Sequence, residues 1–273
     1  MSPLPASLVL VGAGKMGGAM LEGWLRLGLD PRGTTVLDPH VTAPMQALCA
    51  QAGVALNPPL ADVRAPQVLV LAIKPQMLDA AAPGIQHLAG PGTLALSILA
   101  GKTLVDLAQR LPACPALVRA MPNLPASIGR GISGACASAF VSPSQHGMAD
   151  ALLRAVGQVE WLADETLIDA VTAVSGSGPA YVFHLVECLA RAGEAVGLEA
   201  KLAMRLARAT VEGAGELMAR NAATSAAELR VNVTSPGGTT AAALAVLMAA
   251  GGLEPLMRAT VGAAKQRAAA LSG

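Results

Sequence analysis

The chain has 273 residues, of which 53% are hydrophobic, 14% charged and 2% aromatic. A formal net charge of +1 excludes a basic nucleic-acid-binding surface and an acidic disordered tail, and so few aromatic residues leave no platform for stacking bases. The length predicts one large domain or two of ordinary size.

A mean hydropathy of +0.52 raises the question of a membrane span. The longest charge-free stretch, 231–253, contains polar residues and two glycine pairs, and its continuous apolar part, 241–250, is shorter than the ~20 residues that a spanning helix needs. The first residues lack the basic segment of a signal peptide. The cysteines are isolated from one another: Cys49, Cys114, Cys136 and Cys188. We therefore expect a soluble, cytoplasmic protein with free thiols, no metal site and no membrane partner.

The first half of the chain alternates short apolar runs with amphipathic stretches. The runs that predict strands are Leu8–Val11, Thr35–Leu37, Val68–Ile73, Leu94–Ser97 and Ala116–Arg119. The stretches that predict helices between them are Met16–Leu27, Thr42–Ala52, Met77–His87 and Leu104–Leu111. Two more strands, Gly131–Ser138 and Gln158–Trp161, with a helix at Ser144–Val156, are expected to extend the sheet. This alternation predicts an α/β, Rossmann-like, doubly wound and mainly parallel sheet over residues 1–161.

The second part of the chain, residues 162–273, has no convincing strand. Its helical stretches are Tyr181–Val196, Glu199–Asn221, Thr239–Ala250 and Leu253–Leu271. We expect an all-α C-terminal domain here.

A glycine motif, Gly12-Ala13-Gly14-Lys15-Met16-Gly17, follows the first predicted strand and opens the first predicted helix. In a dinucleotide site the first glycine allows a tight turn, the second lets the backbone approach the pyrophosphate and the third lets the helix pack on the sheet. The helix N-terminus then offers N–H groups to the phosphates. The alternative is an ordinary strand-to-helix turn, but the strand, the helix and an acid at the end of the second strand together favour dinucleotide binding.

That acid is Asp38, about twenty residues beyond the motif. A carboxylate at this position hydrogen-bonds the ribose 2′-hydroxyl of NAD and repels the 2′-phosphate of NADP. The alternative is that Asp38 merely begins a turn with Pro39. The sequence therefore favours NADH as the cofactor and leaves NADPH as the alternative.

Two further loops follow predicted strands, at the edge where doubly wound sheets bind ligands. One contains Lys74-Pro75, where the proline predicts an extended Lys74, and the other is Ser97–Gly101. In the helical part, Ser175–Tyr181 is a tight loop with Pro179 placed for a first helical turn. The loop Val233–Thr240 offers hydroxyls and unhindered amides at a helix start, where it could bind a carboxylate or simply cap the helix through Ser235 or Thr239.

Taken in order, these motifs resemble the pyrroline-5-carboxylate reductase family over essentially the whole chain. They are G-x-G-x-M-G, A-x-K-P, S-x-x-A-G, R-A-M-P-N-x-P-A (119–126), S-G-S-G-P-A-Y and S-P-G-G-T-T. The resemblance implies a reductase that passes hydride from NADPH or NADH to the C=N bond of 1-pyrroline-5-carboxylate to give L-proline, the last step of proline biosynthesis. It also implies a homodimer through the helical domain, or a decamer of five dimers, with the substrate site shared between subunits.

The resemblance also implies roles for particular residues. The cofactor would be bound by Gly12, Ala13, Gly14, Lys15, Met16, Gly17, Asp38, Asn57, Ala72, Lys74, Pro75, Ala100, Met121 and Asn123. The substrate would be bound by Glu165, Asn232, Ser235, Gly238, Thr239 and Thr240. Thr240 is the position proposed in the family to hydrogen-bond or protonate the ring nitrogen. The chain departs from the family at Val231, where an acid is common, and at Asp38, where a small polar residue is common.

Two other functions fit part of the pattern. A β-hydroxyacid dehydrogenase shares the glycine motif and a helical second domain, but it needs a catalytic lysine after its second glycine loop, and 179–191 contains none. Alcohol oxidation requires a base, whereas imine reduction requires only a proton donor, so the sequence favours the imine. A non-catalytic dinucleotide sensor would bind the cofactor tightly without turnover.

Overall fold

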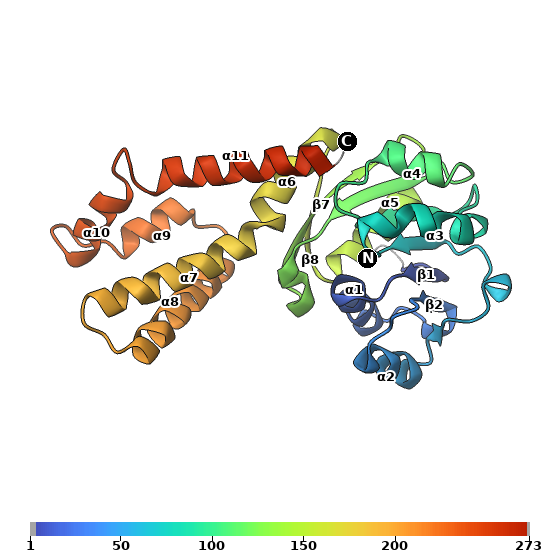
Figure 1. The fold of residues 1–273 in the computed structure, drawn as a ribbon, viewed down its shortest axis with the longest axis horizontal. Helices are drawn as coiled ribbons and strands as arrows, with labels where there is room; N and C mark the ends of the chain where they lie inside the picture. Colours follow the sequence, from blue (N-terminus) through green and yellow to red (C-terminus); the bar gives the residue numbers. More distant parts are fainter. Residues whose placement is uncertain (1–3, 272–273) are drawn as a thin grey trace. The chain divides into compact units, whose positions relative to one another are not determined.

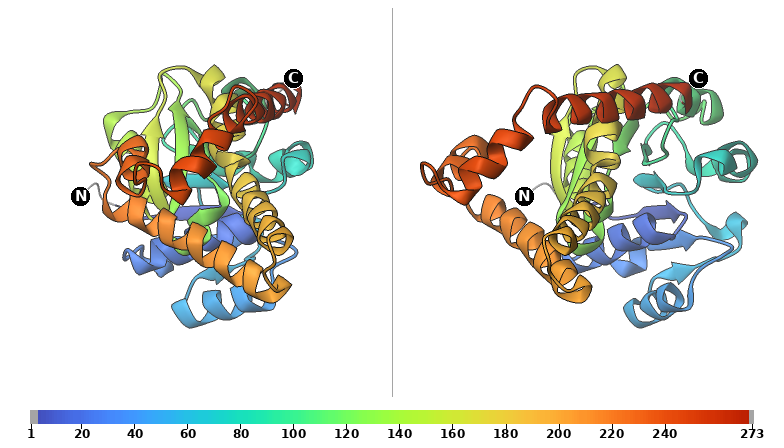
Figure 2. Two further views of the ribbon diagram at one scale, coloured as in Figure 1. Left: turned by 90° about the vertical axis from the view of Figure 1, so that its left-hand side faces the viewer. Right: turned by 60° about the vertical axis from the view of Figure 1, so that its left-hand side comes forward.

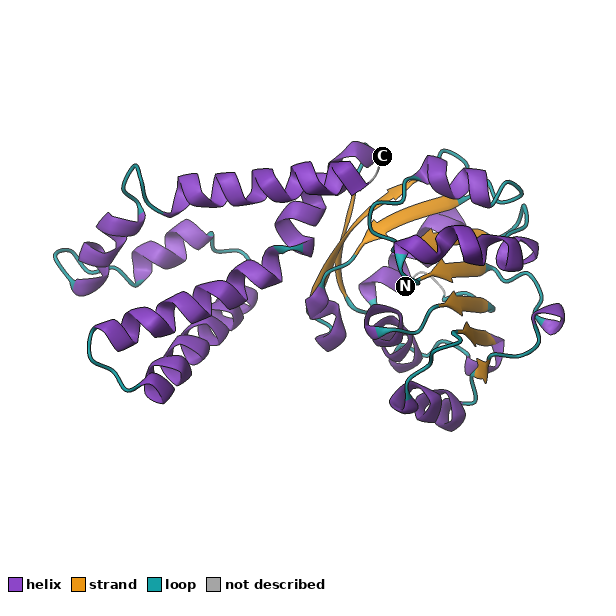
Figure 3. Ribbon diagram, viewed as in Figure 1, coloured by secondary structure: helices purple, strands orange, loops and turns teal. Residues whose placement is uncertain are grey.

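The computed structural model describes residues 4–271. The chain forms two compact units (Figure 1). The first runs to Gly176 and takes in the chain again from Ala264, and the second is Ser177–Ala263. Figure 3 shows that the strands belong to the first unit and that the second is built of helices.

An eight-stranded sheet in the order β3-β2-β1-β4-β5-β6-β7-β8 forms the centre of the first unit. All neighbouring strands are parallel except β6 and β7. The strands are β1 (Leu8–Val11), β2 (Thr34–Leu37), β3 (Ala55–Leu56), β4 (Val68–Leu71), β5 (Leu94–Ser97), β6 (Leu117–Met121), β7 (Gly131–Ala137) and β8 (Gly157–Trp161). Their order reverses between β1 and β4, which is the switch point where doubly wound sheets bind ligands.

Helices cover both faces of this sheet because each central strand is apolar on both sides. The helices are α1 (Lys15–Arg26), α2 (Ala43–Ala52), α3 (Leu78–Ile85), α4 (Leu104–Arg110), α5 (Pro143–Arg154) and α6 (Ile168–Val171). Leu8 and Leu10 pack with α1, α2 and α5 on one face, whereas Val9 and Val11 pack with α3 and α4 on the other. The buried Trp24 of α1 also donates a 2.8 Å hydrogen bond to the Leu152 carbonyl of α5. The predicted doubly wound architecture is therefore confirmed.

The second unit is helical, as predicted. Its helices are α7 (Gly178–Ala195), α8 (Ala200–Arg220), α9 (Ala226–Asn232), α10 (Thr239–Leu247) and the first part of α11 (Leu253–Leu271). Helices α7 and α8 lie side by side and antiparallel (Figures 1 and 2). Pro179 occupies the first turn of α7, as expected. A π-helix at Thr172–Gly176 precedes α7, and neither it nor α9 is evident from the sequence pattern.

The second unit has little core of its own. Within 177–263 the buried residues are three alanines, Ala190, Ala203 and Ala207. Large apolar side chains are instead exposed, for example Phe183 and Leu185 on α7 and Leu206 on α8. Exposed apolar surface on this scale is typical of a subunit interface. Among residues 4–271, no helix is long and apolar enough to span a bilayer.

Candidate active site

The glycine motif forms the turn from β1 into α1 at the switch point of the sheet. Gly12 has φ +93°, and a Cβ there would lie 2.7 Å from the Ala72 carbonyl oxygen. A Cβ on Gly17 would overlap the Gly12 carbonyl. Gly14 is different, because no atom lies within 4 Å of where its Cβ would stand. The first and third glycines are thus required by the fold, and the second leaves open space at the start of α1.

Asp38 lies at the end of β2 and is held against this turn. Its Oδ2 accepts a 2.8 Å hydrogen bond from the N–H of Ala13, and its Oδ1 accepts one of 2.8 Å from the N–H of His40. The side chain of Asn57, a residue with φ +48°, makes two hydrogen bonds to the backbone of Asp38. Its Oδ1 accepts from the Asp38 N–H and its Nδ2 donates to the Asp38 carbonyl, both at 2.8 Å. The structure therefore brings together the glycine motif, Asp38 and Asn57.

The remaining residues assigned to the cofactor follow the carboxyl ends of the next strands. Ala72 follows β4 and contacts the glycine turn, as the Gly12 geometry shows. Lys74 is exposed and extended (φ −67°, ψ 139°), as its following proline predicts, and Pro75 begins a short 3₁₀ turn. Ala100 is exposed beyond the end of β5. Because β1, β2, β4, β5 and β6 are parallel, these positions share one edge of the sheet.

Met121 and Asn123 stand at the carboxyl end of β6. The Asn123 side chain is buried, and its Oδ1 accepts a 3.0 Å hydrogen bond from the N–H of Ile132 on β7. Asn123 therefore ties the β6–β7 connection together. The Met121 methyl group lies 3.0 Å from where a Cβ on Gly176 would stand, so the glycine makes room for it.

Glu165 lies in the first unit and is bonded to protein groups. Its Oε1 accepts a 2.9 Å hydrogen bond from Nη1 of Arg119 and a 2.8 Å bond from the N–H of Leu104. A second carboxylate, that of Asp169, lies 3.7 Å from Nη2 of Arg119. Burial raises the pKa of the Cys136 thiol, which is opposite Arg119 in the β6–β7 register, and Glu165 raises it further. Arg119 received no role from the sequence, although it begins the R-A-M-P-N motif.

The loop 234–240 follows α9 in the second unit and runs into the first turn of α10, which begins at Thr239. Gly237 has φ +71°, and the N–H of Gly238 donates a 3.0 Å hydrogen bond to the Ser235 carbonyl. Gly238 is the N-cap of α10, and no side chain caps the helix. Helix capping by Ser235 or Thr239 was the alternative to carboxylate binding at this loop, and neither side chain caps α10. The first N–H groups of α10, at Thr239 and Thr240, have no acceptor within the helix. Ser235 and Thr239 are exposed, whereas Thr240 is half-buried.

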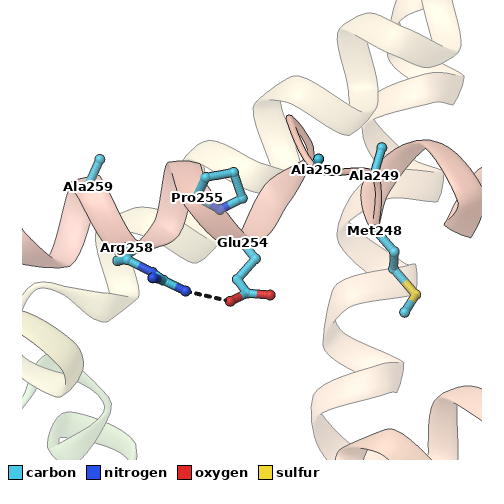
Figure 4. A pocket seen from close by; sticks show the side chains of 7 residues that line it. All are labelled: Met248, Ala249, Ala250, Glu254, Pro255, Arg258 and Ala259. Atoms are coloured by element: carbon cyan, nitrogen blue, oxygen red, sulfur yellow. Dashed lines mark hydrogen bonds and ion pairs between the residues drawn. The ribbon is translucent and has the colours of Figure 1, made fainter.

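Hollows in the second unit lie beside this loop and at the junction of α10 with α11. One is lined by Arg230, Val231 and Thr234 together with residues of α10. The other is lined by Met248, Pro255 and the ion pair of Glu254 with Arg258, whose side chains point toward each other at 2.7 Å (Figure 4). None of the residues assigned to substrate or cofactor lines this second hollow. Among residues 4–271, no group of three His, Cys, Asp or Glu side chains could hold a metal ion.

Family models match both parts of the chain. Residues 165–271 match the model described as pyrroline-5-carboxylate reductase dimerisation, and residues 7–101 match the one described as NADP oxidoreductase coenzyme F420-dependent. The first of these ranges covers most of the predicted C-terminal domain. The second covers the glycine motif, Asp38 and the loop after β4.

Curated relatives match over nearly the full length. A pyrroline-5-carboxylate reductase of Pseudomonas aeruginosa is 38% identical over 265 residues, covering 97% of this chain and 96% of the relative. One of Mycobacterium tuberculosis is 38% identical over 289 residues, covering 96% and 95% respectively. The solved structure of a pyrroline-5-carboxylate reductase from Coxiella burnetii superimposes with a TM-score of 0.90 at 32% identity, covering 98% of this chain and 99% of that one.

Proposed function

The chain belongs to the pyrroline-5-carboxylate reductase family, and from this premise we infer that it reduces 1-pyrroline-5-carboxylate to L-proline with NADPH or NADH. In this reaction the imine carbon gains a hydride and the ring nitrogen gains a proton, so that C=N becomes CH–NH. The structural observation that supports this function, apart from the similarity to family members, is the glycine turn at the switch point of the sheet. The Asp38 carboxylate is fixed beside this turn.

The residues of the first unit fit a dinucleotide. The space beside Gly14 suits a pyrophosphate, because a side chain there would fill it, and the N-terminus of α1 offers N–H groups and a positive dipole end. Lys15 begins this helix and would add a positive charge. Bound NADH or NADPH supplies the hydride. The chain's own residues orient this cofactor. Asn57, Ala72, Lys74, Pro75 and Ala100 would line its adenosine and nicotinamide portions, and Met121 and Asn123 would lie close to the nicotinamide.

We propose that NADH is the preferred cofactor. Both carboxylate oxygens of Asp38 already accept backbone N–H groups, so the side chain is fixed, and each oxygen keeps a lone pair for a ribose hydroxyl. The following turn, residues 39–43, contains no arginine or lysine that could pair with a 2′-phosphate. The 2′-phosphate of NADPH would therefore meet a negative charge without a cation to offset it.

The substrate is proposed to bind at the loop 234–240. The N–H groups of Thr239 and Thr240 would receive its carboxylate, helped by the Ser235 hydroxyl and the dipole of α10. The N–H of Gly238 is already used in the turn, so its proposed contribution is close approach without a side chain. The Thr240 hydroxyl would hydrogen-bond the ring nitrogen and pass on a proton that solvent replaces. Asn232, the last residue of α9, is proposed to contact the ring from the adjoining turn.

The match to the dimerisation model supports a homo-oligomer, and we propose that the second copy covers the exposed apolar faces of α7 and α8. We propose a dimer as the basic assembly, with a decamer of five dimers as its larger form. Residues 1–161 would bind the cofactor, and residues 162–273 would bind the substrate and make the dimer. A cytoplasmic location is also proposed, since the free thiols Cys49, Cys114, Cys136 and Cys188 suit a reducing compartment.

The experiment that tests the function is a cofactor oxidation assay. Purified protein is mixed with 1-pyrroline-5-carboxylate and either NADH or NADPH, and the absorbance of the reduced nicotinamide is followed. The proposal predicts a loss of absorbance that requires both enzyme and imine. Tight cofactor binding without turnover would instead identify a dinucleotide sensor.

A further inference from the structure

Arg119 is the one charged residue that is buried among residues 4–271. Its side chain, only 5% exposed, lies on β6, on the face of the sheet that α3 and α4 cover. A buried charge is costly unless it is paired and hydrogen-bonded. Glu165 and Asp169 supply the pairing, at 2.9 and 3.7 Å.

The Arg119 pair joins three elements at one point. Glu165 precedes α6 and reaches both the guanidinium on β6 and the N–H of Leu104, the first residue of α4. That N–H lies at a helix N-terminus, where a carboxylate is favoured. Asp169, on α6 itself, adds the second contact to Arg119. Losing the charge on Glu165 would loosen β6 from α4 and α6 together.

Helix α6 also packs closely against β7, the strand next to β6. A Cβ on Gly134 of β7 would lie 2.8 Å from a methyl group of Val171, the last residue of α6. The π-helix then brings Gly176 against the methyl group of Met121. Met121 is two residues beyond Arg119 and points to the same side of the sheet. The position of Arg119 and that of the Met121–Gly176 contact are therefore mechanically linked.

We propose that the Arg119–Glu165 pair is a positioning device for hydride transfer. It sets the Met121–Gly176 wall against which the nicotinamide would rest, and Glu165 acts through Arg119 without touching the substrate. The inference rests on the proposed function, since Met121 is placed beside the nicotinamide only there. It differs from the substrate-binding role that family resemblance predicts for Glu165. Misplacement of reacting groups by ~1 Å can cost ~100-fold in rate, so even a small shift of this wall is measurable.

The test uses Glu165→Gln, which keeps the shape and an acceptor for the Leu104 N–H but removes the charge. A matched control is Asp150→Asn, since Asp150 is similarly exposed (24% against 23%) and pairs with Arg154 at 2.7 Å, away from the cofactor edge. We expect Glu165→Gln to lower kcat about tenfold, with KM for the imine within twofold of the wild type. The deuterium isotope effect on kcat with 4-deuterated NADH should rise, because hydride transfer becomes slower. Asp150→Asn should leave kcat and the isotope effect unchanged.

A second pair of variants keeps the proposal testable if one of the variants fails to fold. Arg119→Lys retains the charge without the planar fork, and Arg119→Met removes it. A positioning role predicts that the lysine variant keeps several-fold more kcat than the methionine variant. If Arg119→Met fails to fold, the comparison of Arg119→Lys with Glu165→Gln carries the test. A raised KM for the imine with unchanged kcat in Glu165→Gln would overturn the inference, since it would place Glu165 on the substrate. Absence of turnover in the wild type would refute the proposed function instead.

Discussion

The backbone N–H of Ala13 donates a 2.8 Å hydrogen bond to the carboxylate of Asp38, which joins the turn after β1 to the end of β2. Two features assigned separately from the sequence, the glycine motif and the acid about twenty residues later, are therefore one structure. The bond sets the carboxylate beside the turn that would hold the pyrophosphate. It also means that changing Asp38 alters both cofactor choice and the shape of the turn.

Replacing Asp38 with serine should move cofactor preference toward NADPH. The serine removes the negative charge that a 2′-phosphate would meet, so the ratio of kcat/KM for NADPH to that for NADH should rise about tenfold or more. The control is Asp30→Ser, because Asp30 also accepts a backbone N–H in a turn, at the other end of β2. An unchanged ratio in Asp38→Ser would mean that Asp38 only shapes the turn.

Alanine substitutions of the motif glycines should have two different effects, one on stability and one on cofactor binding. Gly17→Ala forces a methyl group onto the Gly12 carbonyl, so unfolding free energy should fall by about 1–3 kcal/mol. Gly14→Ala meets open space and should leave urea unfolding unchanged while raising the Kd for NADH at least tenfold. If Gly14→Ala bound NADH normally, the pyrophosphate would have to lie elsewhere.

Thr240→Ala tests the proton donor. We expect kcat to fall by about 10²-fold, as for loss of a general acid, while the Kd for NADH changes less than twofold. Thr260→Ala, which removes a hydroxyl bonded to the Leu256 carbonyl on α11, serves as the control. Equal losses of turnover and cofactor binding in Thr240→Ala would show that the residue chiefly supports the start of α10.

A charge on the exposed apolar face of α7 should break the assembly. Leu185, 50% exposed, is proposed to be covered by the second copy, so Leu185→Glu should shift the protein toward monomers and abolish most of its activity. Sedimentation velocity measures the change. The control Val105→Glu on α4, at 64% exposure, should leave the assembly intact. An intact oligomer carrying Leu185→Glu would place the interface on another face.

Acid should remove the stabilisation that Asp106 provides at the start of α4. Burial raises the pKa of this carboxyl, but the hydrogen bonds from the Thr103 N–H and hydroxyl, together with the charges of Lys102 and Arg110, lower it more. The pKa therefore ends below its ordinary value of 3.8. Because the folded pKa is the lower one, the stabilisation is full above pH ~5 and is lost as pH falls through the folded pKa. Asp106→Asn should therefore cost about 1 kcal/mol at pH 7 and less at pH 2.5, measured by urea unfolding. An equal cost of Asp106→Asn at the two pH values would contradict this assignment.

The first unit was predictable because its strands are apolar on both faces and its helices are amphipathic. The predicted strands Leu8–Val11 and Leu94–Ser97 agree with β1 and β5 to the residue. In the helical part, the predicted helix Leu253–Leu271 agrees with α11. The differences have local causes. Helix α10 ends at Leu247 instead of Ala250, since periodicity cannot mark an end within the continuous apolar run 241–250. The two-residue β3 is too short for any alternation to show.

Glycine spacing and strand ends predict the glycine turn, Asp38 and Lys74 as cofactor residues, and the others rest on the family resemblance. The contacts of Arg119 could not be predicted in this way. An arginine in an apolar strand gives no sign of its partners, which lie 46 and 50 residues away in sequence. The bonds of Glu165 to Arg119 and Leu104 are likewise long-range. Asn57 was named only through the family resemblance, and its positive φ and its hydrogen bonds to the Asp38 backbone became visible only in the structure.

The central claim is tested most directly by following NADH oxidation and L-proline formation together. Purified protein is incubated with 1-pyrroline-5-carboxylate and limiting NADH, with NADPH in a parallel reaction. We predict one L-proline for each NADH consumed and a higher kcat/KM with NADH than with NADPH. Absence of L-proline with either cofactor, in protein shown to be folded and to bind NADH, would contradict the account.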